Sequence, residues 1–195
     1  SLVDNQNQRN PMMGQMGGGG SSLDKLLKAW GVTFENSKVV ADRNFQMVLG
    51  DGSDAQRPTW LSLTPEGLDK DDVITSQIDN IWYFAGGAFS GTPADGLKQT
   101  VLLKSTKDSG FVEGFLANLS PESAMKDFKP SGKEQALAVR LTGKFKTAYP
   151  NGDPNQATAE PAAGETNAPA KPVDNSLNES KVESTVILVG DADMI

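Results

Sequence analysis

The segment STVILVGD, residues 184–191, carries the strongest secondary-structure signal in the chain. Residues Val186 to Val189 are apolar without interruption, and three of the four are β-branched, which favours a strand. A strand that is apolar on both faces is typical of a parallel sheet covered by helices on both sides. The segment therefore predicts an α/β fold with a mostly parallel central sheet and flanking helices, in which residues 185–189 form an interior strand.

Other elements are expected along the chain. A helix is predicted from Leu23 to Trp30, because its leucines share one face and Gly31 supplies a left-handed stop. Apolar or alternating runs predict strands, and turn and capping residues predict two further short helices. In the last and longest of these runs, Leu137, Val139 and Leu141 are expected to face inward, and Ala136, Ala138 and Arg140 outward. The strands are expected at residues 38–43, 45–50, 57–64, 81–85, 100–104 and 134–150, and the helices from residue 71 or 72 and after residue 121.

Composition divides the chain into three parts. Its 195 residues suit one domain with a real core. Residues 1–22 are polar and glycine-rich and predict a flexible lead, so the single domain is expected to cover residues 23–195. Residues 151–180 contain no aromatic residue and are rich in proline and alanine, so they cannot offset their own ordering entropy. We expect them to be a disordered, dispensable insertion.

Composition also excludes several functions. The chain has no cysteine and no histidine, which removes a cysteine nucleophile, a Ser-His-Asp triad and a Cys/His zinc site. A formal net charge of -7 argues against binding to nucleic acid and to anionic lipid surfaces. The expectation is a protein that is not an enzyme and that holds no cofactor or metal.

Two weak candidates for a ligand site remain. Asp191 and Asp193 follow the predicted 185–189 strand, at the edge where open α/β sheets bind ligands. Their carboxylates could hold Mg²⁺ or Ca²⁺, although aspartate in this position is also typical of a turn or helix cap. Ser105 and Thr106 begin the segment STKDSG, whose hydroxyl and backbone donors could surround a small anion or form an ordinary polar turn.

Charged and aromatic residues elsewhere have simpler interpretations. The acidic run at residues 69–72 lacks the glycine and distal glutamate of a calcium loop, and predicts a solvated helix start. The basic run at 140–146 could meet an acidic partner or protect a strand edge from aggregation. Trp30, Trp60 and Trp82 are expected mostly in the core.

Several motifs together resemble a known family. They are LDKLLKAWGV with KVVADR, VITSQIDNIWYFAGGAF with VLLKSTKDSGFV, ALAVRLTGKFKTAYP, and STVILVGDADMI, in this order. They resemble the extracytoplasmic region of the gliding-motility-type ABC-transporter auxiliary family, whose relatives are also described as intraflagellar-transport-like domains. The resemblance implies a flavodoxin-like or amidotransferase-like α/β fold, of which this sequence would be a truncated piece. The amidotransferase relatives use cysteine and histidine, so their activity is not implied here.

The resemblance also implies a biological setting. It places the domain on the periplasmic face of the inner membrane, attached through membrane segments outside this sequence, with the ABC permease and ATPase subunits as partners. The leading functional hypothesis is a non-catalytic, extracytoplasmic accessory domain of an ABC-type transport system, acting through contacts with proteins or a ligand. The alternatives are a divalent-metal enzyme using Asp191 and Asp193, and a solute- or glycan-binding module using aromatic residues between Trp82 and Phe89.

Overall fold

The computed structural model describes residues 23–49, 55–119, 121–126, 128–150 and 177–192. The predicted lead at 1–22, most of the predicted insertion at 151–180, and Asp193 lie outside these ranges.

Within the described residues the chain is built mainly of short strands. The helices are α1 (Asp24–Ala29), α2 (Gly114–Leu119) and α3 (Pro121–Met125), with one 3₁₀ helix, η2 (Pro65–Gly67). The strands are β1 (Val32–Phe34), β2 (Lys38–Asp42), β3 (Gln46–Leu49), β4 (Ala55–Leu63), β5 (Ile81–Phe84), β6 (Phe89–Gly91), β7 (Leu97–Lys104), β8 (Ser109–Glu113), β9 (Ala136–Gly143) and β10 (Ser184–Val189).

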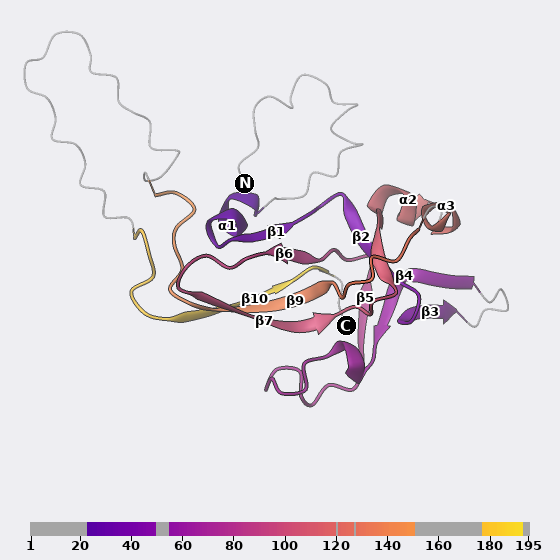
Figure 1. Ribbon diagram of the computed structural model, residues 1–195, viewed down its shortest axis with the longest axis horizontal. Coiled ribbons are helices and arrows are strands. Elements are labelled where there is room, and N and C mark those ends of the chain that lie inside the picture. Colours follow the sequence, from indigo (N-terminus) through magenta and orange to yellow (C-terminus); the bar gives the residue numbers. More distant parts are fainter. Residues whose placement is uncertain (1–22, 50–54, 120, 127, 151–176, 193–195) are drawn as a thin grey trace, which may run out of the picture.

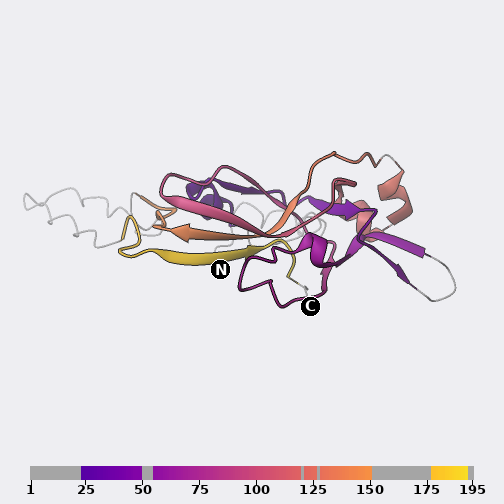
Figure 2. The same ribbon diagram turned by 60° about the horizontal axis from the view of Figure 1, so that its bottom comes forward.

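The strands form three antiparallel sheets, which Figure 1 shows side by side. In the main sheet β9 lies between β7 and β10, and β6 joins the end of β9 and pairs in turn with β1. A two-stranded sheet pairs β2 with β8, and a three-stranded sheet has the order β3-β4-β5. Both views place α2 and α3 at the opposite end of the molecule from α1 (Figures 1 and 2).

The predicted α/β fold with a parallel, flavodoxin-like or amidotransferase-like sheet is therefore wrong. Every strand pair in the described part of the chain is antiparallel. Parallel neighbours need a crossover connection of about a dozen or more residues, usually a helix. The α-helices that the structure describes have only five or six residues each, too few to cover the faces of a parallel sheet.

The prediction of an interior strand at residues 185–189 is also wrong. Strand β10 pairs with β9 alone among the described strands, so it lies at an edge of the main sheet. Val186 and Leu188 point to one face and pack into a core cluster with Val139 and Leu141 of β9. Ile187 points to the other face, where 46% of its surface is exposed. The unbroken apolar run thus reflects β propensity on an exposed face and does not report burial on two sides.

The strand buried at the centre is β9. Leu137, Val139 and Leu141 are fully buried and alternate with more exposed residues, and this alternation is the one that the sequence predicted. Ala138 departs from the expected pattern because it is buried in the largest core cluster, which also contains Leu137. Alternation of this kind is typical of an antiparallel sheet with one face covered and one face partly open to water.

Several local predictions are confirmed. Helix α1 ends at the expected place, and Gly31 has the left-handed φ of +75° that stops it. A side chain at Gly31 would also collide with the backbone of Thr92. Strands β2, β3, β4, β5 and β7 and helix α3 overlap their predicted ranges. The helix predicted from residue 71 or 72 is wrong, because residues 70–77 form consecutive turns.

Three clusters of buried side chains hold the sheets together. The largest joins all three sheets through Val40 of β2, Leu61 of β4, Tyr83 of β5 and Leu137 of β9. A second lies between α1 and the main sheet, and a third between β2, β8 and the helices α2 and α3. None of the helices in the described ranges is long and apolar enough to cross a bilayer.

Candidate functional site

Asp191 lies where β10 leaves the main sheet and meets β5. Gly190 donates its N–H to the carbonyl of Leu137 at 3.0 Å, and its own carbonyl accepts the N–H of Gly87 at 2.9 Å. One residue further on, Asp191 Oδ2 accepts the backbone N–H of Phe84 at 2.6 Å. These bonds attach the end of β10 to β5 and to the loop after it, so the Asp191 carboxylate links two sheets.

Tyr83 is buried directly beside this link. Its hydroxyl donates to the carbonyl of Gly87 at 2.5 Å, and its ring leaves no space for a side chain at Gly86 or Gly190. A Cβ at Gly190 would lie 2.4 Å from the Tyr83 hydroxyl oxygen. Burial, followed by the nearby negative charge of Asp191, raises the pKa of Tyr83 far above its ordinary value. Close packing of one tyrosine thus explains Gly86 and Gly190, while a side chain at Gly87 would collide with the ring of Phe34.

The Asp191/Asp193 hypothesis can be compared with this geometry for Asp191 only, because Asp193 lies outside the described residues. In the part of the chain that the structure describes, no three Asp or Glu side chains come together as metal ligands would. The position of Asp191 after a strand end agrees with the sequence. Its observed bond is to the backbone of β5, a strand that sequence reasoning did not connect with it.

Thr106, one of the two residues proposed to bind an anion, donates to a carboxylate of the chain itself. The side chain of Asp42 is fully buried at the end of β2. Its Oδ2 accepts the backbone N–H of Thr106 at 2.6 Å, and its Oδ1 accepts the Thr106 hydroxyl at 2.9 Å. The same Oδ1 accepts the N–H of Asn44 at 2.8 Å and that of Phe45 at 3.2 Å. Four donors therefore stabilise the carboxylate and balance its desolvation.

The remaining hydroxyls of the segment bond to one another and to the backbone. Ser105 Oγ and Ser109 Oγ lie 2.6 Å apart, and both serines are buried. Ser105 Oγ also accepts the N–H of Gln135 at 2.8 Å, while Ser109 donates to the carbonyl of Thr106 at 2.6 Å. The expected donors for an anion are present, and the segment uses them to join β2, β8 and the start of β9.

Asp72 is a buried member of the acidic run that was predicted to be a solvated helix start. Its Oδ2 lies 2.6 Å from Nη1 of Arg140 on β9, with 2% of the Asp72 side chain and 26% of the Arg140 side chain exposed. Its Oδ1 accepts the N–H of Ile74 at 3.0 Å. The pair fastens the long loop between β4 and β5 onto the main sheet. It also removes Arg140 from the positive charges available to an outside partner.

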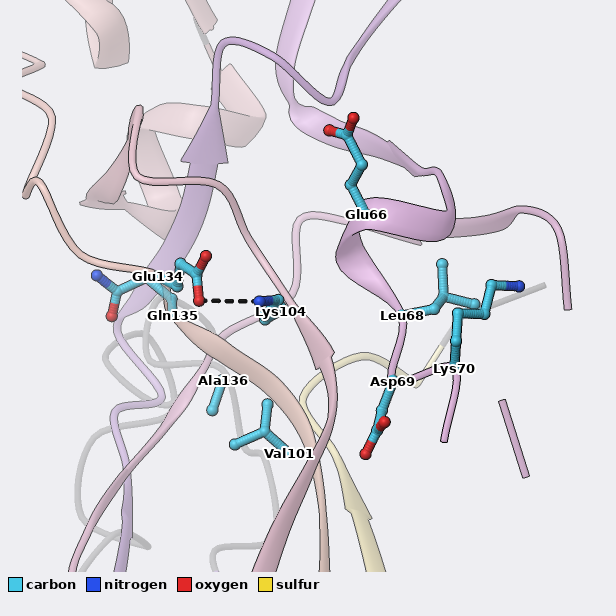
Figure 3. A pocket seen from close by; sticks show the side chains of 9 residues that line it. All are labelled: Glu66, Leu68, Asp69, Lys70, Val101, Lys104, Glu134, Gln135 and Ala136. Carbon is cyan, nitrogen blue, oxygen red and sulfur yellow. Dashed lines mark hydrogen bonds and ion pairs between the residues drawn. The ribbon is translucent and has the colours of Figure 1, made fainter. Parts of the chain in front are cut away.

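An open cleft of about 460 Å³ lies between this loop and the strands β7 and β9. Figure 3 shows Lys104 and Glu134 facing each other across its wall, with Nζ and Oε2 3.1 Å apart. Both side chains are about two-fifths exposed, and such pairs stabilise a protein by about 0–1 kcal/mol. Lys70, at the opposite wall, donates to the carbonyl of Ile78 at 2.6 Å. The described residues that line the cleft therefore present one solvated ion pair and no convergent acid–base arrangement.

The aromatic residues of β4 and β5 form a different kind of surface. We use the name outer aromatic surface for Arg57, Trp60, Trp82 and Phe84. Trp60 pairs with Phe84 across the two strands, and Trp82 pairs with Ser62, so the three rings share one face of the sheet. The opposite face carries Leu61, Leu63, Ile81 and Tyr83, which are all buried. The expectation that Trp60 and Trp82 lie in the core is wrong, since 38% and 45% of their surfaces are exposed.

Sequence reasoning thus missed the residues with the clearest roles. The alternation in TWLSL placed Trp60 and Ser62 together on one face, and a serine on that face was a signal that it is open to water. Asp42, two residues before an asparagine, had the pattern of a turn in which the aspartate caps the backbone. No local pattern joined Asp72 to Arg140 or Asp191 to Phe84, because these contacts form only in the folded chain.

The described part of the chain is an antiparallel β-sheet protein, and its candidate site residues form hydrogen bonds and ion pairs mainly with other residues of the same chain. Comparison with known proteins assigns it to a family. Residues 2–195 match the family described as "ABC-type uncharacterized transport system". The chain belongs to this family of auxiliary components of ABC-type transport systems. Comparison with curated proteins and with solved structures gave no match.

Proposed function

We propose that this chain is a non-catalytic, extracytoplasmic docking domain of an ABC-type transport system, in the gliding-motility-type branch of its family. It contacts the permease subunit directly, and the ATPase joins the same assembly from the other side of the membrane. The observation that carries the proposal is the family match, which extends over residues 2–195 and so over the whole described fold.

The structure supports docking because of what its side chains are used for. The carboxylates of Asp42, Asp72 and Asp191 each accept backbone N–H groups, and Asp72 also pairs with Arg140. These are roles that maintain the fold. Large apolar side chains are meanwhile exposed on the outer aromatic surface, where 38% of Trp60 and 45% of Trp82 are open. Exposed apolar patches on a folded domain commonly mark sites of protein–protein contact.

The proposal is tested by affinity purification of the full-length protein from native membranes in mild detergent. We expect the permease and ATPase subunits of one ABC system to be retained with the tagged protein. The matched control is an unrelated membrane protein that carries the same tag and is expressed at the same level. Failure to retain either subunit above this control contradicts the proposal.

The location is tested by labelling a single cysteine, which is simple because this chain contains none. Asp95 lies exposed in the turn before β7, so Asp95→Cys leaves the core unchanged. A membrane-impermeant maleimide should label this variant of the full-length protein in intact cells, and should not label the parent protein to the same extent. Labelling that occurs only after the cells are lysed contradicts an extracytoplasmic location.

A further inference from the structure

The outer aromatic surface combines exposed tryptophan with the guanidinium of Arg57. Arg57 Cζ lies 5.8 Å from the ring centroid of Trp60, a separation at which a cation is attracted to the ring. Arg57 Nε is buried and has no hydrogen-bond partner among the described residues, and no carboxylate in the described ranges lies within 4.0 Å of this side chain. Nε itself is out of reach of an outside group, but Arg57 as a whole is only half-buried, so a partner would meet the accessible part of its side chain.

The three rings have a fixed but uneven arrangement. The Phe84 ring lies 5.5 Å from Trp60 and 6.1 Å from Trp82 between centroids, and its plane is inclined to theirs by 83° and 72°. Neither indole is coplanar with Phe84, so the three rings do not form one flat platform. Rings that stand at such angles present edges as well as faces, and apolar side chains of a protein can pack against both.

We propose that the outer aromatic surface docks an acidic, apolar segment of the permease subunit. A carboxylate of that segment pairs with the guanidinium of Arg57, and its apolar side chains cover Trp60 and Trp82. The inference rests on the proposed function and adds the surface and the chemistry of the partner. Tryptophan and arginine dominate the binding energy of protein interfaces more than other residue types do.

The chain's net charge does not prevent an acidic partner from binding here. The formal charge is -7, but charges more than about 8 Å apart are largely screened at physiological ionic strength. The contact of a carboxylate with Arg57 is much shorter than this screening length, and the adjoining indole shields the pair from water. The Asp191 carboxylate, at the edge of β5, is already bonded to the N–H of Phe84. Local pairing with Arg57 therefore decides the charge preference of this surface.

The test measures how much permease the full-length protein retains after purification from native membranes. The double variant Trp60→Ala/Trp82→Ala should retain at least about tenfold less permease than the wild type, and Arg57→Gln at least about threefold less. The matched control is Phe115→Ala, which removes a still more exposed aromatic side chain, 63% open, from α2 and should change retention by less than about twofold. Equal retention by the wild type and the double variant overturns the inference.

A second measurement does not depend on the stability of an alanine variant. A photoreactive benzoyl-phenylalanine in place of Trp82 should crosslink to the permease in intact cells, and the same residue in place of Phe115 should not. A crosslink from position 82 to another part of its own chain, or to a glycan, overturns the inference. If the wild type itself retains no ABC subunit, the proposed function fails, and this outcome is distinguishable from a failure of the surface alone.

Discussion

The Oδ2 atom of Asp191 and the backbone nitrogen of Phe84 lie 2.6 Å apart although 107 residues separate them in the chain. This bond joins the end of the edge strand β10 to the outer end of β5. It therefore connects the main sheet with the sheet that carries the outer aromatic surface. A carboxylate at a strand end, which in the sequence suggested a ligand site, here holds two sheets in position.

The first prediction concerns the strength of this link. Asp191→Ala removes the charged acceptor of the Phe84 N–H, and hydrogen bonds to charged groups contribute about 1.5–3 kcal/mol. We expect a loss of this size in the free energy of unfolding, measured by urea denaturation. Asp191→Asn keeps an oxygen acceptor and should cost less. The exposed Asp95→Ala serves as the control, and an Asp191→Ala variant as stable as this control would contradict the role.

Asp72 and Arg140 should respond unequally to substitution. Arg140→Met leaves a carboxylate that is 2% exposed without its cation, and breaking a buried pair in this way costs about 3–5 kcal/mol. Asp72→Asn leaves an arginine that is 26% exposed and can recover water, so it should cost less. The double variant Arg140→Met/Asp72→Asn should lose less free energy of unfolding than the two single variants lose together. Strictly additive losses in thermal and urea unfolding would show that the pair does not interact.

The Asp42 network predicts a large loss of stability from a single substitution. Asp42→Ala leaves two N–H groups of the following turn, and both the N–H and the hydroxyl of Thr106, without their acceptor. Because unpaired buried donors cost about 1–3 kcal/mol each, the total loss should reach about 3 kcal/mol or more. Lys107→Ala, in the same loop but exposed, should remain within about 0.5 kcal/mol of the wild type. A mild effect of Asp42→Ala would disprove the structural role of the network.

Tyr83 predicts the response of stability to alkaline pH. Its pKa is raised in the folded chain, so the unfolded chain releases the proton first, near the ordinary value of about 10. The stability that this group contributes is complete below that pH and falls as the pH rises further, by up to about 1.4 kcal/mol per pH unit. The free energy of unfolding, measured from pH 9 to 11, should therefore fall more steeply with pH for the wild type than for Tyr83→Phe. An equal pH dependence in the two proteins would contradict the burial of this hydroxyl.

The sequence contained the local elements but not their connections. Helix α1 and its stop at Gly31 follow from leucine spacing and one glycine, and the alternation around Leu137 correctly marks the covered face of β9. The fold class could not be obtained in the same way, because an apolar residue on an open face, such as Ile187, looks identical to a buried one. The antiparallel pairing of β10 with β9 is a long-range contact that no local period reports.

The candidate site residues likewise combine local features that the sequence shows with long-range contacts that it does not. Ser105 and Thr106 were proposed as donors for a bound anion; in the structure Thr106 donates to Asp42, 64 residues earlier in the chain, and Ser105 bonds to Ser109 and Gln135. Trp82 was expected in the core because apolar residues usually are, while its partner across the strands, Ser62, showed that the face is wet. Bonds between distant residues and the choice of open face both depend on tertiary packing, which overrides local propensity.

The most direct test of the account measures the permease retained per amount of folded full-length protein, for the wild type and for Asp191→Asn/Asp193→Asn. The account predicts that the wild type retains the permease and that the double variant retains it to within about twofold, because docking uses the outer aromatic surface and the asparagine oxygen can still accept the Phe84 N–H. Loss of the permease from the double variant, with an unchanged melting temperature, would contradict the account and assign the function to the two carboxylates.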